Sequence, residues 1–362
     1  MALALLEASN GHGRSLLNAA GRLQAALSTS PRWHTAGGRM NETGFFMESY
    51  AAARKEGNQT RGCSRFRRKV HGLPLSRGIP ARKETFRTDR RDRPMPPPPK
   101  ASPILADKLY AAKAAFTPEN LLREARRQKG LLDAPVPRIC VLDPDGDMVR
   151  QLKAAGRAHL DPTWACYHTD LYRTTQEGLE LGLVGCAVGA PFAVLVAEQL
   201  FASGCCLLIS MTSAGRLAEV RQPPYFVLIE TALRDEGTSY HYLPPAEFST
   251  ANPKLLDRVN GAFSHLRIAV EKGATWTTDA PFRETAETIA AMKAKGLLAV
   301  EMEAAALYAF GEARRKPVLC FAHVTNQMAL VEGDFEKGDA DGTLDAMAVI
   351  VAAARACRVE LG

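Results

Sequence analysis

Cysteine patterns that bind metal are absent from this chain of 362 residues. Its eight cysteines form no CxxC pair, and no cysteine–histidine group has the spacing of a zinc site. Several, including Cys140 and Cys320, lie in apolar runs, where a free cysteine behaves as a small hydrophobic residue. The pattern predicts a protein without a bound metal in a reducing compartment, the cytoplasm.

Long uninterrupted apolar runs are also scarce. Met1–Ala26 lacks the continuous apolar core and small-residue cleavage site of a signal peptide, although scattered arginines leave a transit peptide as an alternative. Leu181–Ala197 carries no charge, which invites a membrane interpretation. Glycines and the loop-forming Gly189-Ala190-Pro191 interrupt it, so we expect a strand, a loop and a buried helix, and no membrane partner.

Excess positive charge is missing from most of the chain. Residues 1–94 hold 18 of the 46 Lys and Arg and 7 of the 39 Asp and Glu, which leaves 28 basic and 32 acidic residues for the remainder. A basic groove for nucleic acid would therefore have to come from the N-terminal quarter alone. We expect no nucleic-acid partner, with salt-sensitive binding by this basic segment as the alternative.

Residues 1–100 show no sustained hydrophobic periodicity. Two basic clusters, Arg61–Lys69 and Arg82–Arg93, precede a proline run at 94–99 that Met95 alone interrupts. Such a segment cannot bury enough apolar surface to offset its ordering entropy, so we predict a disordered tail or linker. A second hypothesis is that translation starts at Met95.

Residues 101–362 have the alternating strands and helices of one α/β domain with a mixed, partly parallel sheet. The predicted strands are Arg138–Leu142, Cys166–Tyr172, Leu179–Cys186, Cys206–Ser210, Tyr225–Thr231, Leu266–Val270 and Val318–Val324. The predicted helices are Pro118–Arg127, Phe192–Ala202, Glu284–Lys295, Met302–Arg315 and Thr343–Arg358.

Three segments at strand ends could bind an anion or a small ligand. Gly146-Asp-Met-Val-Arg150 combines a glycine turn, whose N–H groups could face an anion, with an arginine fork. Gly185–Pro191 is rich in small residues that allow close approach of a ligand, or equally tight packing. Thr212 and Ser213 offer hydroxyls at a strand end, for phosphate or sugar or for capping a turn.

The sharpest pattern is Val300-Glu-Met-Glu-Ala-Ala-Ala-Leu-Tyr308, where an apolar strand becomes an alanine-rich helix. A carboxylate has two acceptor oxygens that match the two hydroxyls of a ribose cis-diol, and its charge opposes the positive charge of a sugar losing its base. The Met302 thioether could pack on the sugar or base. Acidic capping of a helix N-terminus explains one of Glu301 and Glu303, but not both.

These motifs, in this order, resemble the nucleoside phosphorylase superfamily of uridine phosphorylase, hexameric purine nucleoside phosphorylase and the methylthioadenosine nucleosidases. Gly146–Arg150 looks like its GDPxR phosphate turn, with Met148 in place of proline. Gly185–Pro191 resembles the GxGxGxP run, Ser213-Ala-Gly215 the phosphate-side Ser/Thr-x-Gly, and Val300–Glu303 the VEME ribose motif. The resemblance implies a single three-layer α/β/α domain with a mixed, partly barrel-like central sheet.

The resemblance also assigns roles to residues. It implies that Gly146, Arg150, Thr212 and Ser213 bind phosphate, and that Glu301, Met302 and Glu303 bind ribose, with Glu303 and Arg150 catalytic. The stretches Leu233–Tyr242 and Gly273–Thr285 favour the uridine branch. By that likeness Phe282 stacks on the base and Arg283 contacts pyrimidine carbonyls, with Asn326 nearby.

The chain departs from the family pattern at three places. Ser210 stands where a second phosphate arginine is usual. A histidine that the family lends to the neighbouring subunit has no counterpart between Ala101 and Arg138. Asn326 replaces the aspartate that protonates a purine, and because an amide cannot be a general acid, adenine chemistry is disfavoured.

The expected function is phosphorolysis of a ribonucleoside, uridine foremost, to free base and ribose 1-phosphate. Inorganic phosphate would be the co-substrate, with no metal or organic cofactor. The partners would be the nucleoside, phosphate and further copies of the chain in a dimer or hexamer. The alternatives are a nucleosidase that uses water and a catalytically silent nucleoside-binding member.

Residues 1–94 are predicted to be dispensable, because they hold neither a core pattern nor a site residue. A chain beginning at Met95 should express, assemble and turn over substrate like the full chain, as gel filtration and steady-state kinetics would show. Failure of the shortened chain to fold would mean that an integral domain precedes Met95.

Overall fold

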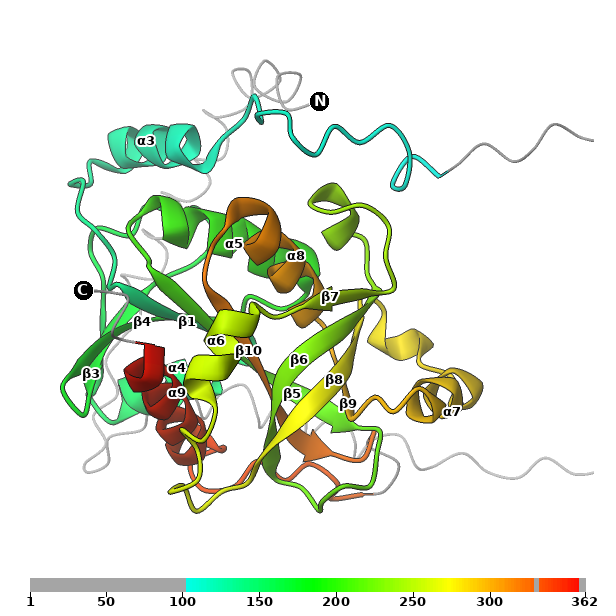
Figure 1. The fold of residues 1–362 in the computed structure, drawn as a ribbon. Helices are drawn as coiled ribbons and strands as arrows, with labels where there is room; N and C mark the ends of the chain where they lie inside the picture. Colours follow the sequence, from blue (N-terminus) through cyan, green and yellow to red (C-terminus); the bar gives the residue numbers. More distant parts are fainter. Residues whose placement is uncertain (1–101, 329–331, 358–362) are drawn as a thin grey trace, which may run out of the picture. The chain divides into compact units, whose positions relative to one another are not determined.

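The computed structural model describes residues 102–328 and 332–357 (Figure 1). The described residues belong to one compact unit of the chain. The predicted tail, residues 1–100, lies outside the described residues. Within the described residues no helix is long and apolar enough to cross a membrane.

The described domain is built on one mixed sheet whose strands follow the order β10-β6-β8-β9-β5-β1-β4-β3-β2, with β7 beside β6. A further pairing of β10 with β5 closes five of them, β5, β10, β6, β8 and β9, into a small barrel. The strands are β1 Ile139–Asp143, β2 Ala158–Leu160, β3 Tyr172–Gln176, β4 Leu179–Gly185, β5 Leu207–Arg216, β6 Tyr225–Asp235, β7 Phe248–Thr250, β8 Val270–Thr278, β9 Ala299–Glu301 and β10 Val318–Asn326.

Helices cover both faces of this sheet. One buried cluster packs α5 and α8 on one face, and a second packs α4, α6 and α9 on the other (Figure 1). The helices are α3 Pro118–Lys129, α4 Asp147–Ala154, α5 Ala190–Ala202, α6 Pro253–Val259, α7 Ala286–Ala294, α8 Ala304–Arg314 and α9 Thr343–Cys357, with short 3₁₀ turns η1 Ser239–His241 and η2 Pro281–Arg283. The predicted three-layer α/β/α architecture with a partly barrel-like sheet is confirmed.

The charge-free segment from Leu181 to Ala197 is divided as the sequence predicts. β4 ends at Gly185, Gly189 has φ of 87°, and α5 begins at Ala190 with Pro191 in its first turn, where a missing N–H costs nothing. Apolar residues surround α5 because it packs against both α8 and the sheet. Its uniform hydrophobicity therefore reflects burial within the domain.

Two predicted strands are wrong, and each error has a physical cause. Cys166–Asp170 forms a loop held partly by a hydrogen bond from Trp164 Nε1 to Thr169 Oγ1 (3.0 Å), and β3 begins only at Tyr172. Leu266–Val270 mostly precedes β8, which runs on to Thr278. The buried β8 threonines face a carboxylate, so hydrophobicity does not reveal them.

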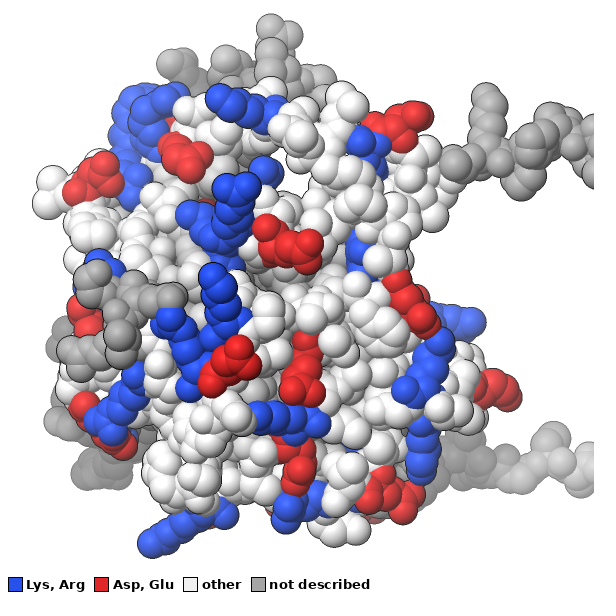
Figure 2. Space-filling view, viewed as in Figure 1, with Lys and Arg blue, Asp and Glu red and all other residues white. Residues whose placement is uncertain are grey.

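Acidic and basic side chains are interspersed over the face shown in Figure 2. No broad field of one sign dominates this face. That distribution agrees with the mildly acidic composition of the chain after residue 94.

Tyr308 ties α8 to the sheet, and its removal should be costly. Its buried hydroxyl donates to the Ile229 carbonyl (2.6 Å) and accepts from the Cys320 N–H (3.0 Å). Tyr308→Phe leaves both backbone groups without this partner, so the free energy of unfolding should fall by about 1–3 kcal/mol in a denaturant titration. Tyr167→Phe, at an exposed hydroxyl, is the control and should change little; equal losses would contradict the assignment.

Candidate functional site

Glu303 lies at the junction of β9 and α8, where the closed part of the sheet meets the helix. β9 pairs with β5 through Val300 and Gly215, which brings the two ends of these strands together. The Glu303 carboxylate is 1% exposed. Its Oε1 accepts from the Gly189 N–H (2.7 Å) and its Oε2 from Thr212 Oγ1 (2.8 Å).

Three predicted segments therefore meet at one carboxylate. Gly189 comes from the glycine-rich run before α5, Thr212 from β5 and Glu303 from the β9–α8 junction. Gly189 lies 114 residues and Thr212 lies 91 residues before Glu303 in the sequence. Met302 follows the last residue of β9, and its N–H lies 3.3 Å from Glu303 Oε2. Sequence separation this large shows that the fold, not local structure, assembles the cluster.

Glu301 has a different role from Glu303. Its carboxylate accepts from Thr275 Oγ1 (3.1 Å) and Thr277 Oγ1 (2.5 Å) of β8, and from the N–H groups of Glu303 and Ala304 (2.7 Å each). These four donors occupy the acceptor directions of a carboxylate. Glu301 therefore holds the start of α8, and its predicted ribose contact stays a prediction, as does that of Glu303.

The electrostatics of the two glutamates are coupled. Burial raises the pKa of Glu303 to about 7, and the charge of Glu301 adds to the rise against hydrogen bonds from Gly189 and Thr212. Burial likewise raises the pKa of Glu301. An acid with a pKa near neutrality in a buried cluster is a common mark of a functional site.

The Gly146 turn differs from its prediction. Its N–H donates to the carbonyl (2.9 Å) and carboxylate (3.1 Å) of Asp143, so it does not face an anion. Gly146 is needed for another reason: φ is 74°, and a Cβ there would lie 2.7 Å from Cys186 Sγ. The turn thus packs the first strand end against the glycine-rich run.

Arg150 lies on the first turn of α4 with its side chain 60% exposed. Its guanidinium donates to the Asp145 carbonyl (2.9 Å) and pairs with the Asp147 carboxylate. It also lines a cavity of about 440 Å³ that includes Gly146, Cys186 and His168. The Arg150 guanidinium is therefore accessible to an anion, although it already binds the Asp145 carbonyl and the Asp147 carboxylate.

Thr212 and Ser213 point to opposite faces of β5. Thr212 holds Glu303, while Ser213 Oγ lies 3.0 Å from Thr325 Oγ1 on β10. Ser213 also lines a cavity of about 20 Å³ whose other walls include four aspartates and a histidine. The sequence predicted no role for these residues, which are Asp143, Asp145, Asp147, Asp341 and His323.

Lys337 is a further residue that sequence reasoning missed. Its Nζ lies 2.7 Å from Asp145 Oδ2 and 2.5 Å from Asp147 Oδ2. It belongs to the segment between β10 and α9, which has no motif. Its only signal in the sequence is a positive charge after the last strand, which is too common to mark a site.

The predicted base-binding residues divide into two groups. Asn326 ends β10 opposite Gly215 of β5 and is 7% exposed; its Oδ1 accepts from the Met328 N–H (2.9 Å). Phe282 is fully exposed on η2, and no contact in the described part of the chain joins Phe282 or Arg283 to Glu303. The structure brings Asn326 to the β5–β9–β10 junction and leaves the η2 pair outside.

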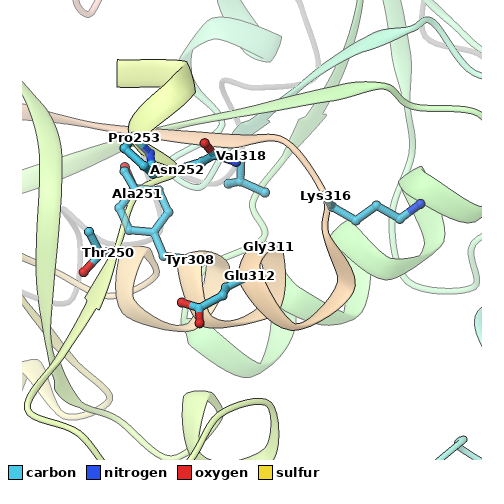
Figure 3. Close-up of a pocket in the computed structure, with 9 residues that line it drawn as sticks. All are labelled: Thr250, Ala251, Asn252, Pro253, Tyr308, Gly311, Glu312, Lys316 and Val318. Carbon is cyan, nitrogen blue, oxygen red and sulfur yellow. The ribbon is translucent and has the colours of Figure 1, made fainter. Parts of the chain in front are cut away.

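A separate cavity of about 230 Å³ lies beside the C-terminal half of α8 (Figure 3). Tyr308, Glu312 and Lys316 are among its lining residues, and none of the predicted site residues borders it. In the two described stretches no His, Cys, Asp and Glu group could hold a metal ion.

Comparison with known families matches this arrangement. A family model described as the phosphorylase superfamily matches residues 138–359, which contain every element from β1 to α9. The chain belongs to the phosphorylase superfamily. Its nucleoside phosphorylase fold is shared by uridine phosphorylase of Vibrio fischeri, with a TM-score of 0.52 and 21% identity over 62% of this chain and 92% of that one. It is also shared by purine nucleoside phosphorylase of Toxoplasma gondii, with a TM-score of 0.53 and 17% identity over 64% of this chain and 94% of that one.

Curated relatives of this superfamily member are similar at somewhat higher identity. Guanosine phosphorylase of Halorubrum lacusprofundi is 26% identical over 48% of this chain and 71% of its own length. A DeoD-type purine nucleoside phosphorylase of Bacillus cereus is 28% identical over 37% of this chain. The match spans 58% of the Bacillus enzyme and 66% of a similar enzyme of Brevibacillus brevis.

The ionisation of Glu303 should control turnover. Because its pKa is about 7 and the ionised form is the better acceptor, kcat/KM should fall as pH drops through that value. Glu303→Gln should lose this acidic limb, and kcat should drop on the order of 10²-fold, the scale of lost transition-state electrostatics. Pre-steady-state and steady-state assays on ribonucleosides across pH 5–9 would measure both.

Glu301→Gln is the contrasting variant. It replaces one carboxylate oxygen by an NH2 group, so two of the four hydrogen bonds lose their acceptor and the melting temperature should fall, whereas Glu303→Gln should keep it within a few degrees. Near-normal turnover by Glu303→Gln at neutral pH would remove Glu303 from the centre of the site.

Proposed function

We propose that this chain cleaves the glycosidic bond of a ribonucleoside with phosphate, releasing the free base and ribose 1-phosphate. The observation that supports it is the buried Glu303 carboxylate, held by Gly189 and Thr212 at the junction of three family motifs. A carboxylate fixed in this way can accept both hydroxyls of a ribose diol. It is positioned by the fold before substrate binds, which is what electrostatic catalysis requires.

The reaction follows from charge. As the bond between C1′ and the base nitrogen breaks, its electron pair leaves with the base and the sugar ring becomes positive. Ionised Glu303 opposes that charge through the sugar, and a phosphate oxygen then forms a bond to C1′. Arg150 and Ser213 are the residues proposed to orient phosphate, with Met302 packing against the sugar.

The departing base must carry the electron pair. Asn326 has no acidic proton to give, but its amide can donate a hydrogen bond to a base whose carbonyl oxygen spreads the negative charge. Uracil, guanine and hypoxanthine have such a carbonyl, and adenine does not. The proposal therefore names an oxo base.

Two oxo bases have separate support. The sequence stretches around Leu233–Tyr242 and Gly273–Thr285 favour uridine. Guanosine is the second candidate, favoured by the 26% identity to a guanosine phosphorylase and by the similarity to purine nucleoside phosphorylases. The curated relatives named for their substrate act on guanosine or purines, and we give this similarity more weight, so we place guanosine ahead of uridine.

A substrate panel tests the proposal. Uridine, guanosine, inosine and adenosine are incubated with and without phosphate, and free base, ribose and ribose 1-phosphate are measured. We expect phosphate-dependent ribose 1-phosphate from the oxo nucleosides, guanosine fastest, and little from adenosine. Arg150→Ala should raise the KM for phosphate about tenfold or more, the scale of a lost charge-assisted bond.

Arg355→Ala, at an exposed pair with Glu177, is the matched control and should leave the phosphate KM unchanged. Free ribose forming at the same rate without phosphate would replace the phosphorylase by a nucleosidase. Nucleoside binding with no cleavage would favour a silent binding protein.

A further inference from the structure

The small cavity that Ser213 lines has an unfavourable charge balance for an anion, and the proposed phosphate arginine, Arg150, lines a different cavity. Asp143, Asp145, Asp147 and Asp341 line the same small cavity as Ser213. Burial, with the charges of Asp145 and Asp147, raises the pKa of Asp143 to about 6, so it is mostly ionised at neutral pH. A phosphate dianion approaching four carboxylates needs more than one cation nearby.

The position that usually carries a second arginine in this family supplies no charge. Ser210 is 1% exposed, and its hydroxyl has no hydrogen-bond partner among the described residues. His323 lines the same cavity but is not a cation either: burial, and then the charge of Lys337, lowers its pKa to about 4.

Other arginines that could compensate are engaged elsewhere. Arg234 is 4% exposed and donates to Ser239 Oγ (2.8 Å) and to two loop carbonyls. Arg216 donates to the Arg221 carbonyl (3.1 Å) and to Gln327. Neither guanidinium is directed at the aspartates.

We propose that Lys337 is the second cation of the phosphate site, taking the role that Ser210 cannot perform. This inference rests on the phosphorolytic function proposed above. Asp147 holds the two cations side by side, with Arg150 on Oδ1 and Lys337 on Oδ2. The second cation thus comes from the segment after β10 and not from β5.

The contacts of Lys337 suit this role. Although burial opposes it, hydrogen bonds to Asp145 and Asp147 raise the pKa of Lys337, so it is charged at neutral pH. An ammonium has three N–H donors, and these aspartates occupy two. Its side chain is 26% exposed, which leaves the third donor accessible to an anion.

The segment that carries Lys337 is fixed to both sides of the site. The Glu336 N–H donates to the Thr325 carbonyl (2.8 Å), and Asp341 accepts from Gln151 Nε2 of α4 (2.7 Å). Lys337 is therefore positioned by backbone and side-chain bonds on either side of it. Lys337 does not itself line the cavity of about 20 Å³, but its partners Asp145 and Asp147 do, so the anion reaches Lys337 as one of these aspartate bonds is exchanged for a phosphate oxygen.

The test compares Lys337→Met, Lys337→Arg and Lys272→Met in the full chain. Among the residues that the structure describes, the Lys272 side chain donates to the exposed Asn260 (2.6 Å), and the variant controls for the loss of one positive charge. Calorimetric titration with inorganic phosphate gives Kd without turnover, and kinetics give KM separately for phosphate and nucleoside. Lys337→Met should raise the phosphate Kd and KM about tenfold or more with little change in nucleoside KM.

Lys337→Arg should restore most of the phosphate affinity, and Lys272→Met should match the wild type. Unchanged phosphate binding by Lys337→Met in a wild type that does phosphorolyse would overturn the inference alone. Equal rises in both KM values with a lower melting temperature would also overturn it, as a purely structural segment. A wild type that binds no phosphate and releases free ribose would overturn the proposed function and this inference together.

Discussion

The hydrogen bonds to Glu301 are the constraint on which the site depends. Two β8 threonines and two N–H groups at the start of α8 converge on this one buried carboxylate. They fix where the strand ends and the helix begins, and the next carboxylate, Glu303, is placed by that junction. Because β9 has three residues, a shift of one position would turn Glu303 away from Gly189 and Thr212.

Much of the fold could be predicted from sequence because its central elements are apolar. β1, β4 and β10, with α5 and α8 on one face of the sheet, are buried apolar segments, and their length and the glycines and prolines at their ends identify them. The barrel was available only through the family resemblance, since strand closure leaves no local signal. β8 was displaced in the prediction because Thr275 and Thr277 are buried for their hydroxyls and not for apolar surface.

The site could be predicted where residue type and motif coincide. Glu303, Thr212 and Gly189 come from motifs, and the structure joins them. The partners of charged side chains are harder to predict from sequence. Whether Asp143 supports a helix turn or repels a ligand depends on tertiary contacts, which the spacing of residues in the sequence does not determine. Lys337 lies 190 positions from Asp147 in sequence, so only the tertiary fold reveals their pairing.

The raised pKa of Glu303 links stability to function. A rise from 4.5 to about 7 means that burial and the charge of Glu301, less the hydrogen bonds that Glu303 accepts, together disfavour the ionised form by about 3 kcal/mol. For an acid with a raised pKa, this protonated-state stability is complete below the unfolded value and is lost as pH rises through about 7. At neutral pH the fold therefore holds a partly uncompensated negative charge. In the reaction that we propose, a sugar that becomes positive as its base departs would supply the missing opposite charge, and the interaction would be strongest in the transition state, where it would lower the barrier.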